Sequence, residues 1–110
     1  MRSRTWSMGG RQAPVIDGMN SFDLARVCQV EAALAQAWID LEEQPSAQVV
    51  ARLRVVKSVM DGLARSGLTA PEDRVEWLRN PNRAFAHEAP IDLLSRGETK
   101  PVLDYIERLS

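Results

Sequence analysis

Few residues of this 110-residue chain have the types and spacing that catalysis requires. His87 is the only histidine, and it stands between an Asn-Pro-Asn turn and Pro90 with no evident catalytic partner. Cys28 is the only cysteine, which excludes an internal disulfide and a zinc site built on paired cysteines. A phosphate-binding glycine loop and a nucleophile elbow are also absent from the sequence. The chain is therefore predicted not to be an enzyme and to need no cofactor and no metal.

The reactive residue types have simpler structural interpretations. We expect His87 at the surface or in an interface, and Cys28 as a small buried apolar residue. Acidic pairs occur at residues 42–43 and 72–73. Salt-bridged or solvated surface is the more ordinary role for such pairs than paired-carboxylate catalysis.

One pattern indicates nucleic-acid binding. Residues 22–38 have the spacing of a helix-turn-helix, with an apolar helix, a tight turn and a second helix that ends in an aromatic residue. The residues placed to hold these helices together are Leu24, Ala25, Val27, Val30 and Leu34. However, residues 27–51 contain no Lys or Arg that could meet a phosphate, and they carry Glu31, Asp40, Glu42 and Glu43. We therefore expect a degenerate helix-turn-helix whose DNA binding is weak at best and strongly salt-dependent.

Composition narrows the class of protein. The net charge is -1, so no global field draws the chain to nucleic acid or to an anionic membrane. Hydrophobic residues make up 45% and aromatic residues 5%, which favours a helical core of Ala, Val and Leu. No apolar run approaches the roughly 20 residues of a membrane span, and no apolar stretch follows the basic start. These observations predict an all-α protein of the cytoplasm.

Helix signals place the elements. The predicted helices cover about residues 21–27, 30–39, 47–66, 70–78, 83–86, 90–94 and 100–109. Asn20 or Ser21 is expected to cap the first helix and Ser46 the third, which Gly67 ends. Thr69 is expected to open the next helix with a capping box.

Two apolar faces follow from the helical spacing. The first helix is expected to bury Phe22 together with Leu24, Ala25 and Val27. The last helix is expected to bury Val102, Leu103, Ile106 and Leu109 on one face.

The chain divides into three predicted parts. Residues 1–19, with several Gly and Arg, are expected to be a flexible N-terminal arm, or alternatively a basic arm that folds on a partner. Residues 20–66 form a helical region that ends in a long helix, and residues 67–110 form a smaller helical domain.

Residues 77–106 carry an irregular Pro/Asn/Gly pattern that is hard to obtain by chance. Its positions are Trp77, Pro81, Asn82, Phe85, Pro90, Asp92, Leu93, Leu94, Gly97 and Val102. The large apolar residues among them must converge on one small core, Asn82 can cap the next turn, and Gly97 permits a positive φ. Asp92 falls in the first turn of a helix, where a negative charge is favoured. These roles are structural, so the motif residues are expected mainly to hold the shape of the domain, as a scaffold for its surface.

This pattern resembles the toxin-binding domain of the Xre/MbcA/ParS antitoxin family. The resemblance implies a Xre-like helix-turn-helix and a long helix before that domain, and binding to a RES-domain toxin that consumes NAD. Two departures concern the contact surface. Ala86, His87 and Glu88 replace the glycines that members often have before the central Pro, and the chain ends at Ser110, without the tail that members commonly carry.

Contact with the toxin is expected on the outer side of this domain. The candidate residues are Arg83, His87, Tyr105, Glu107, Arg108 and Ser110. Tyr105 is expected as a flat anchor, and the acidic end of the chain as a match for groups that bind the pyrophosphate of NAD. Ordinary solvated residues at a helix end are the alternative.

The sequence thus predicts the antitoxin of a type II toxin–antitoxin pair, acting in complex with its toxin and as a homodimer. One alternative is a helix-turn-helix autorepressor whose main role is to bind its own operator. Another is an orphan scaffold that has kept the fold and lost its toxin.

Overall fold

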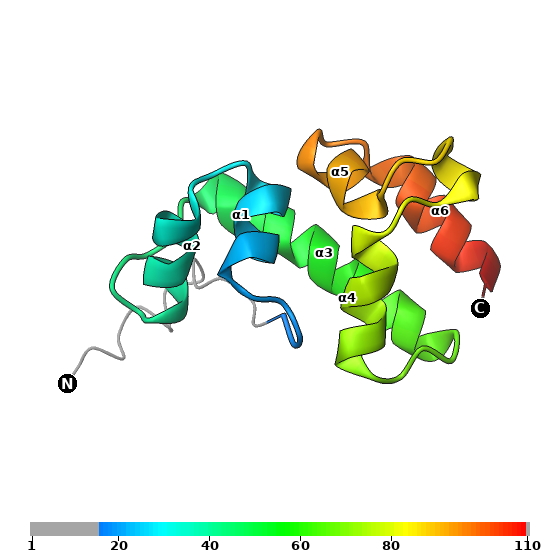
Figure 1. Cartoon of the computed structure of the whole chain (residues 1–110), viewed down its shortest axis with the longest axis horizontal. Helices are drawn as coiled ribbons and strands as arrows, with labels where there is room; N and C mark the ends of the chain where they lie inside the picture. Colours follow the sequence, from blue (N-terminus) through cyan, green and yellow to red (C-terminus); the bar gives the residue numbers. More distant parts are fainter. Residues whose placement is uncertain (1–15, 110) are drawn as a thin grey trace.

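The computed structural model describes residues 16–109, and every named element in this range is helical (Figure 1). The elements are α1 (Ser21–Cys28), α2 (Ala32–Ile39), α3 (Ala47–Arg65), α4 (Pro71–Arg79), the short 3-10 helix η2 (Arg83–Phe85), α5 (Pro90–Ser95) and α6 (Thr99–Leu109). The only β pairing recorded in this range is an isolated bridge between Asn82 and Glu88. The predicted all-α class is confirmed.

Local capping chemistry explains the starts of α1 and α3. The side chain of Asn20 accepts from the backbone N–H of Asp23, and Asp23 accepts in return from the N–H of Asn20, which is a complete capping box. Ser46 caps α3 through the N–H of Val49, as expected. The predicted Thr69 cap is wrong, because Ala70 takes the N-cap position of α4 without a side-chain bond. Pro71 explains the shift, since it occupies the first helical turn and holds the preceding residue in an extended conformation.

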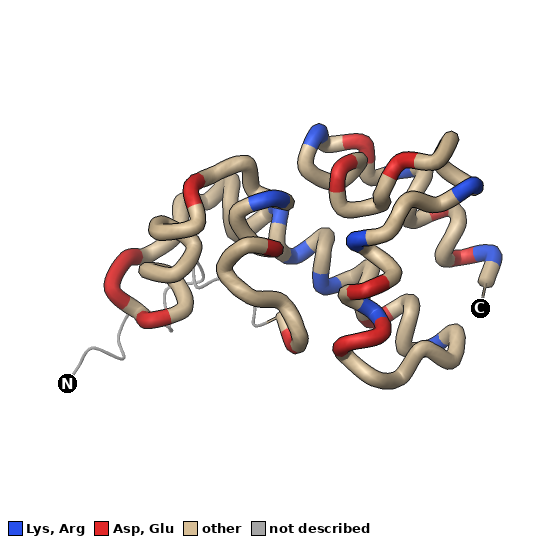
Figure 2. The backbone as a smooth tube through the Cα atoms, in the orientation of Figure 1, with Lys and Arg blue, Asp and Glu red and all other residues tan. Residues whose placement is uncertain are grey.

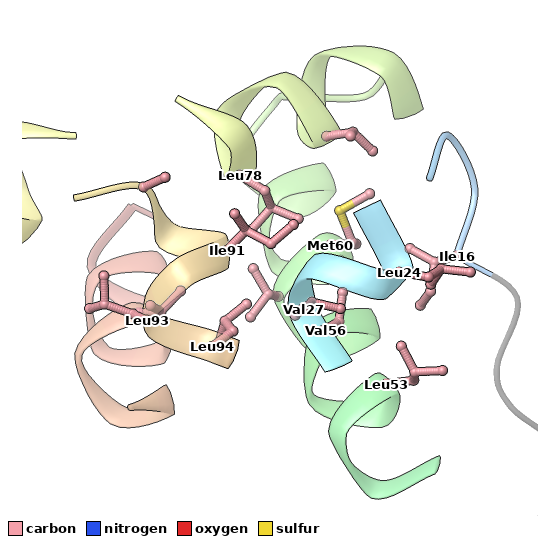
Figure 3. Packing of buried hydrophobic residues seen from close by; sticks show 14 of the residues in the cluster. Ile16, Leu24, Val27, Leu53, Val56, Met60, Leu78, Ile91, Leu93 and Leu94 are labelled. Carbon is pink, nitrogen blue, oxygen red and sulfur yellow. The ribbon is translucent and has the colours of Figure 1, made fainter. Parts of the chain in front are cut away.

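The long helix α3 lies at the centre of the molecule, and α1, α4 and α6 pack against it (Figures 1 and 3). Its inward face buries Val50, Leu53, Val56, Val59, Met60 and Leu63. All of these except Val50 belong to one hydrophobic cluster that runs from Ile16 to Ile106. The helices before and after α3 therefore share a continuous core.

The predicted N-terminal arm falls mostly outside the described residues, which exclude 1–15. Its last residues belong to the fold: Ile16 is buried in the core, and Met19 packs against it. Residues 16–19 are therefore not part of a flexible arm.

Two predicted apolar faces need correction. Phe22 is 73% exposed, because the inward face of the eight-residue helix α1 carries Asp23, Leu24 and Val27 instead. Leu103 and Leu109 are 36% and 45% exposed. Only Val102 and Ile106, one helical turn apart, are buried on α6. A short helix buries one narrow face, and its tertiary neighbours decide which face that is.

Gly62 allows α3 and α6 to approach closely. A Cβ at this position would lie 2.5 Å from Cγ2 of Ile106. Although Ala favours helices over Gly by about 1 kcal/mol, we expect Gly62→Ala to lower the free energy of unfolding by about 1–2 kcal/mol. Urea denaturation followed by circular dichroism measures the change.

A double variant tests the cause of that loss. In an Ile106→Ala background the clashing methyl group is gone, so Gly62→Ala should become neutral or stabilising. If Gly62→Ala stabilises the otherwise native chain, the close approach of the two helices is refuted.

Candidate functional site

Three aromatic side chains from three elements meet beside α6. Trp77 of α4 stacks on Tyr105 of α6, with ring centroids 6.1 Å apart and an interplanar angle of 20°. Phe85 of η2 meets both rings edge-on, at 6.2 Å from Trp77 and 5.4 Å from Tyr105. Phe85 is buried, while Trp77 and Tyr105 are half-buried. Such pairs stabilise a fold beyond their buried area.

Tyr105 therefore lies elsewhere than expected. Instead of standing free on the outer side of α6, its ring belongs to the aromatic cluster of Trp77, Phe85 and Tyr105. This cluster joins the end of α4 and η2 to α6, and it remains partly exposed because Trp77 and Tyr105 are half-buried.

The other scaffold residues occupy structural positions. Pro90, Leu93, Leu94 and Val102 are buried, whereas Pro81 is exposed before η2. The Asn82 side chain accepts from the N–H of Ala84 and so caps η2. Gly97 has a φ of +84°, the left-handed conformation expected after α5.

The segment from Asn82 to Glu88 forms a closed loop, here called the 82–88 loop. The carbonyl of Asn82 accepts from the N–H groups of Phe85 and His87, both at 2.9 Å. The N–H of Asn82 donates to the carbonyl of Glu88, and the N–H of Glu88 donates to that of Phe85. Backbone bonds within the loop therefore fix its shape.

Two consecutive non-glycine residues of this loop have left-handed backbones, with φ of +57° at Ala86 and +68° at His87. Residues with a Cβ adopt this region at a cost that glycine does not incur. This geometry gives a physical reason for glycine at these positions in the pattern that the chain resembles.

The contact candidates are spread over the loop and the end of α6. Arg83 and His87 are exposed on the 82–88 loop, and Glu107 and Arg108 are exposed on α6. Ser110 lies outside the described residues. Arg96 pairs with Glu88 and Glu98, and so holds the end of the loop beside the turn that follows α5.

Guanidinium groups fix α1 to the C-terminal elements. Arg26 of α1 donates two bonds to Asp92 of α5, at 2.9 and 2.8 Å. Arg79 of α4 donates two bonds to Asp23 of α1, at 2.9 and 2.7 Å. Both pairs have the two-bond geometry that makes Arg–carboxylate contacts specific.

A third guanidinium group joins the ends of two helices. Arg52 of α3 donates from Nη1 to the carbonyls of Val27 and Ser95, near the C-terminal ends of α1 and α5. Positive charge is favourable at these ends. Sequence reasoning found none of the three contacts, because the partners lie 25 to 66 residues apart.

These contacts also shift acid–base equilibria. Burial alone would raise the pKa of Asp23, but the bonds from Arg79 and from the Asn20 N–H outweigh it and leave that pKa below its ordinary value. The Arg26 hydrogen bond likewise lowers the pKa of Asp92. Burial raises the pKa of the half-buried Cys28 thiol to about 11, so this thiol is a poor nucleophile at neutral pH.

Acidic residues surround the end of α2 and the turn after it, as Figure 2 shows. Basic residues lie instead along α3 and on the C-terminal elements.

Residues 16–109 contain no group of three or more His, Cys, Asp or Glu that could hold a metal ion. Within the same range, no helix is both long and apolar enough to cross a bilayer.

These elements form a small helical unit with a hydrogen-bonded loop and a partly exposed aromatic cluster. Residues 63–110, a little under half of the chain, match the family model of the antitoxin Xre/MbcA/ParS C-terminal toxin-binding domain. This part of the chain is similar to that family. A search of the curated proteins and a search of the solved structures gave no match.

Proposed function

We propose that the chain is the antitoxin of a type II pair, and that it binds and neutralises a RES-domain toxin that consumes NAD. The observation that carries the proposal is the toxin-binding family match over residues 63–110. The antitoxin itself acts without catalysis and without a cofactor, in the cytoplasm where the NAD pool of the cell is available.

Neutralisation works by covering the active-site cleft of the toxin. A cleft that binds NAD offers positive groups or amide donors to the pyrophosphate. The end of α6 supplies a group of suitable charge, because the Glu107 carboxylate is exposed there. Arg108 is exposed beside it and would meet acceptors at the rim of the cleft.

Residues 20–66 serve as the platform on which residues 67–110 are displayed. Support comes from the guanidinium contacts of Arg26, Arg52 and Arg79, which join the two parts, and from their shared core. The pattern at α1 and α2 is that of a degenerate Xre-like helix-turn-helix. The assembly is a complex of toxin with an antitoxin homodimer.

Co-expression with a RES-domain protein encoded beside this gene tests the proposal. We expect the two proteins to purify as one complex, whose mass by light scattering gives the stoichiometry. We also expect the toxin to consume NAD alone and to stop when the antitoxin is added in equal amount. Unchanged NAD consumption in the presence of the folded antitoxin refutes the proposal.

Autorepression of its own operon is the second candidate function. It is the weaker of the two, because residues 27–51 offer no Lys or Arg to a DNA backbone. A gel-shift titration of the promoter fragment at physiological salt decides between them. Nanomolar, sequence-specific binding by the isolated chain would make operator recognition a main role.

A further inference from the structure

The 82–88 loop is an exposed part of the segment that matches the toxin-binding family model. Helix α1 packs on α5 and is bonded to it through Arg26. Helix α4 is held by Asp23 and packs against α3 and α5, and α6 packs against α3 and α5. In the loop itself, Arg83, Ala84, Ala86, His87 and Glu88 are all exposed.

His87 adopts a strained backbone, and its side chain makes no contact that would offset this cost within the described residues. Its φ is +68°, directly after Ala86 at +57°, and glycine would adopt either conformation without that cost. The imidazole has no hydrogen bond or ion pair with any of residues 16–109, and it adds nothing to the core. A strained residue whose side chain makes no contact within its own chain is characteristic of a residue that acts on a partner.

The loop also holds this residue in a defined position. The backbone bonds from Asn82 to Phe85, His87 and Glu88 close the loop, and Phe85 anchors it in the aromatic cluster. The ion pair between Arg96 and Glu88 fixes its end. A side chain on such a loop loses little additional freedom when it binds.

We propose that His87 is a specificity-determining contact of this antitoxin, and that it binds a carboxylate or carbonyl acceptor at the rim of the toxin's cleft. The inference rests on the proposed function. Arg83, on the same loop, has an exposed guanidinium group with no bonding partner among residues 16–109 and supplies further donors. The matching toxin surface is therefore rich in acceptors, and toxins that lack them are bound less tightly.

Glycine substitutions separate strain from contact. The probe is the product of the neighbouring gene, first assayed for NAD consumption and then titrated by calorimetry against the undivided 110-residue chain. Both His87→Gly and Ala86→Gly should raise the melting temperature by a few degrees, because both relieve a left-handed residue. Only His87→Gly should weaken toxin binding, by about tenfold, because it alone removes a hydrogen-bonding group.

A third variant checks the chemistry. Asn tolerates the left-handed region and keeps a side-chain N–H donor, so His87→Asn should recover part of the lost affinity. The inference is overturned if His87→Gly binds the toxin as tightly as the native chain, or if Ala86→Gly weakens binding equally. Such results leave the proposed function intact. A native chain that fails to bind the toxin refutes both.

Discussion

Leu94→Ala should lower the free energy of unfolding by about 2–5 kcal/mol. Leu94 is fully buried on α5, a helix that packs against α1, α4 and α6 at once. Removal of its side chain opens a cavity that three neighbouring helices would have to fill, and rigid neighbours collapse only partly. Urea denaturation monitored by circular dichroism gives the change, and toxin binding should be lost in proportion to the unfolded fraction.

Leu103→Ala is the matched control, since it makes the same chemical change on a residue of α6 that is 36% exposed. It should cost at most about 1 kcal/mol, because less apolar surface is buried and no cavity forms. Equal losses at the two positions would contradict the assignment of Leu94 to the core.

Asp23→Ala is expected to cost about 2–3 kcal/mol. The carboxylate side chain is only 8% exposed, and it accepts two bonds from Arg79 and one from the Asn20 N–H. The substitution thus removes the capping box of α1 and the link between α1 and α4 together. Asp92→Ala breaks the equivalent pair with Arg26, whose side chains are about 40% exposed, and should cost less than about 1 kcal/mol.

The pH dependence of stability separates the charge of Asp23 from its volume. The folded-state pKa of Asp23 lies below its ordinary value, so its contribution is complete above that value and is lost as the pH falls through the folded pKa. Asp23→Asn should therefore destabilise the protein near neutral pH and flatten the decline of stability in acid. A pH profile as steep as that of the native chain would contradict this role.

Local chemistry made the helix starts predictable. Asn20 and Ser46 cap their helices through neighbouring N–H groups, and Asn82 does the same for η2, so only nearby residues are involved. The choice of buried face was less predictable. Phe22 is a large apolar residue in the right periodic pattern, yet α1 buries Asp23 instead, because Arg79 from a distant helix binds it.

In the candidate functional site, too, features set by nearby residues were predictable, and features set by distant contacts were not. Gly97 indicated a left-handed residue after α5, and the structure has one there. The left-handed backbones of Ala86 and His87 were not predicted, because neither residue type requires that conformation. The stack between Trp77 and Tyr105 was not predictable, because helical spacing places Tyr105 only within α6 and not against α4. Expectations that depend on a partner protein, including the roles of Glu107 and Arg108, remain predictions.

The contacts that hold α5 affect how this protein can be divided into fragments. The family segment begins at residue 63, yet Arg26 and Arg52, which bind α5 through Asp92 and the Ser95 carbonyl, precede it. An excised fragment of residues 63–110 lacks these two arginines and the helix α1 that packs on α5. Affinity measured with such a fragment would contain both the free energy of toxin binding and the free energy of ordering the unsupported helix α5. Binding studies should therefore use the undivided chain.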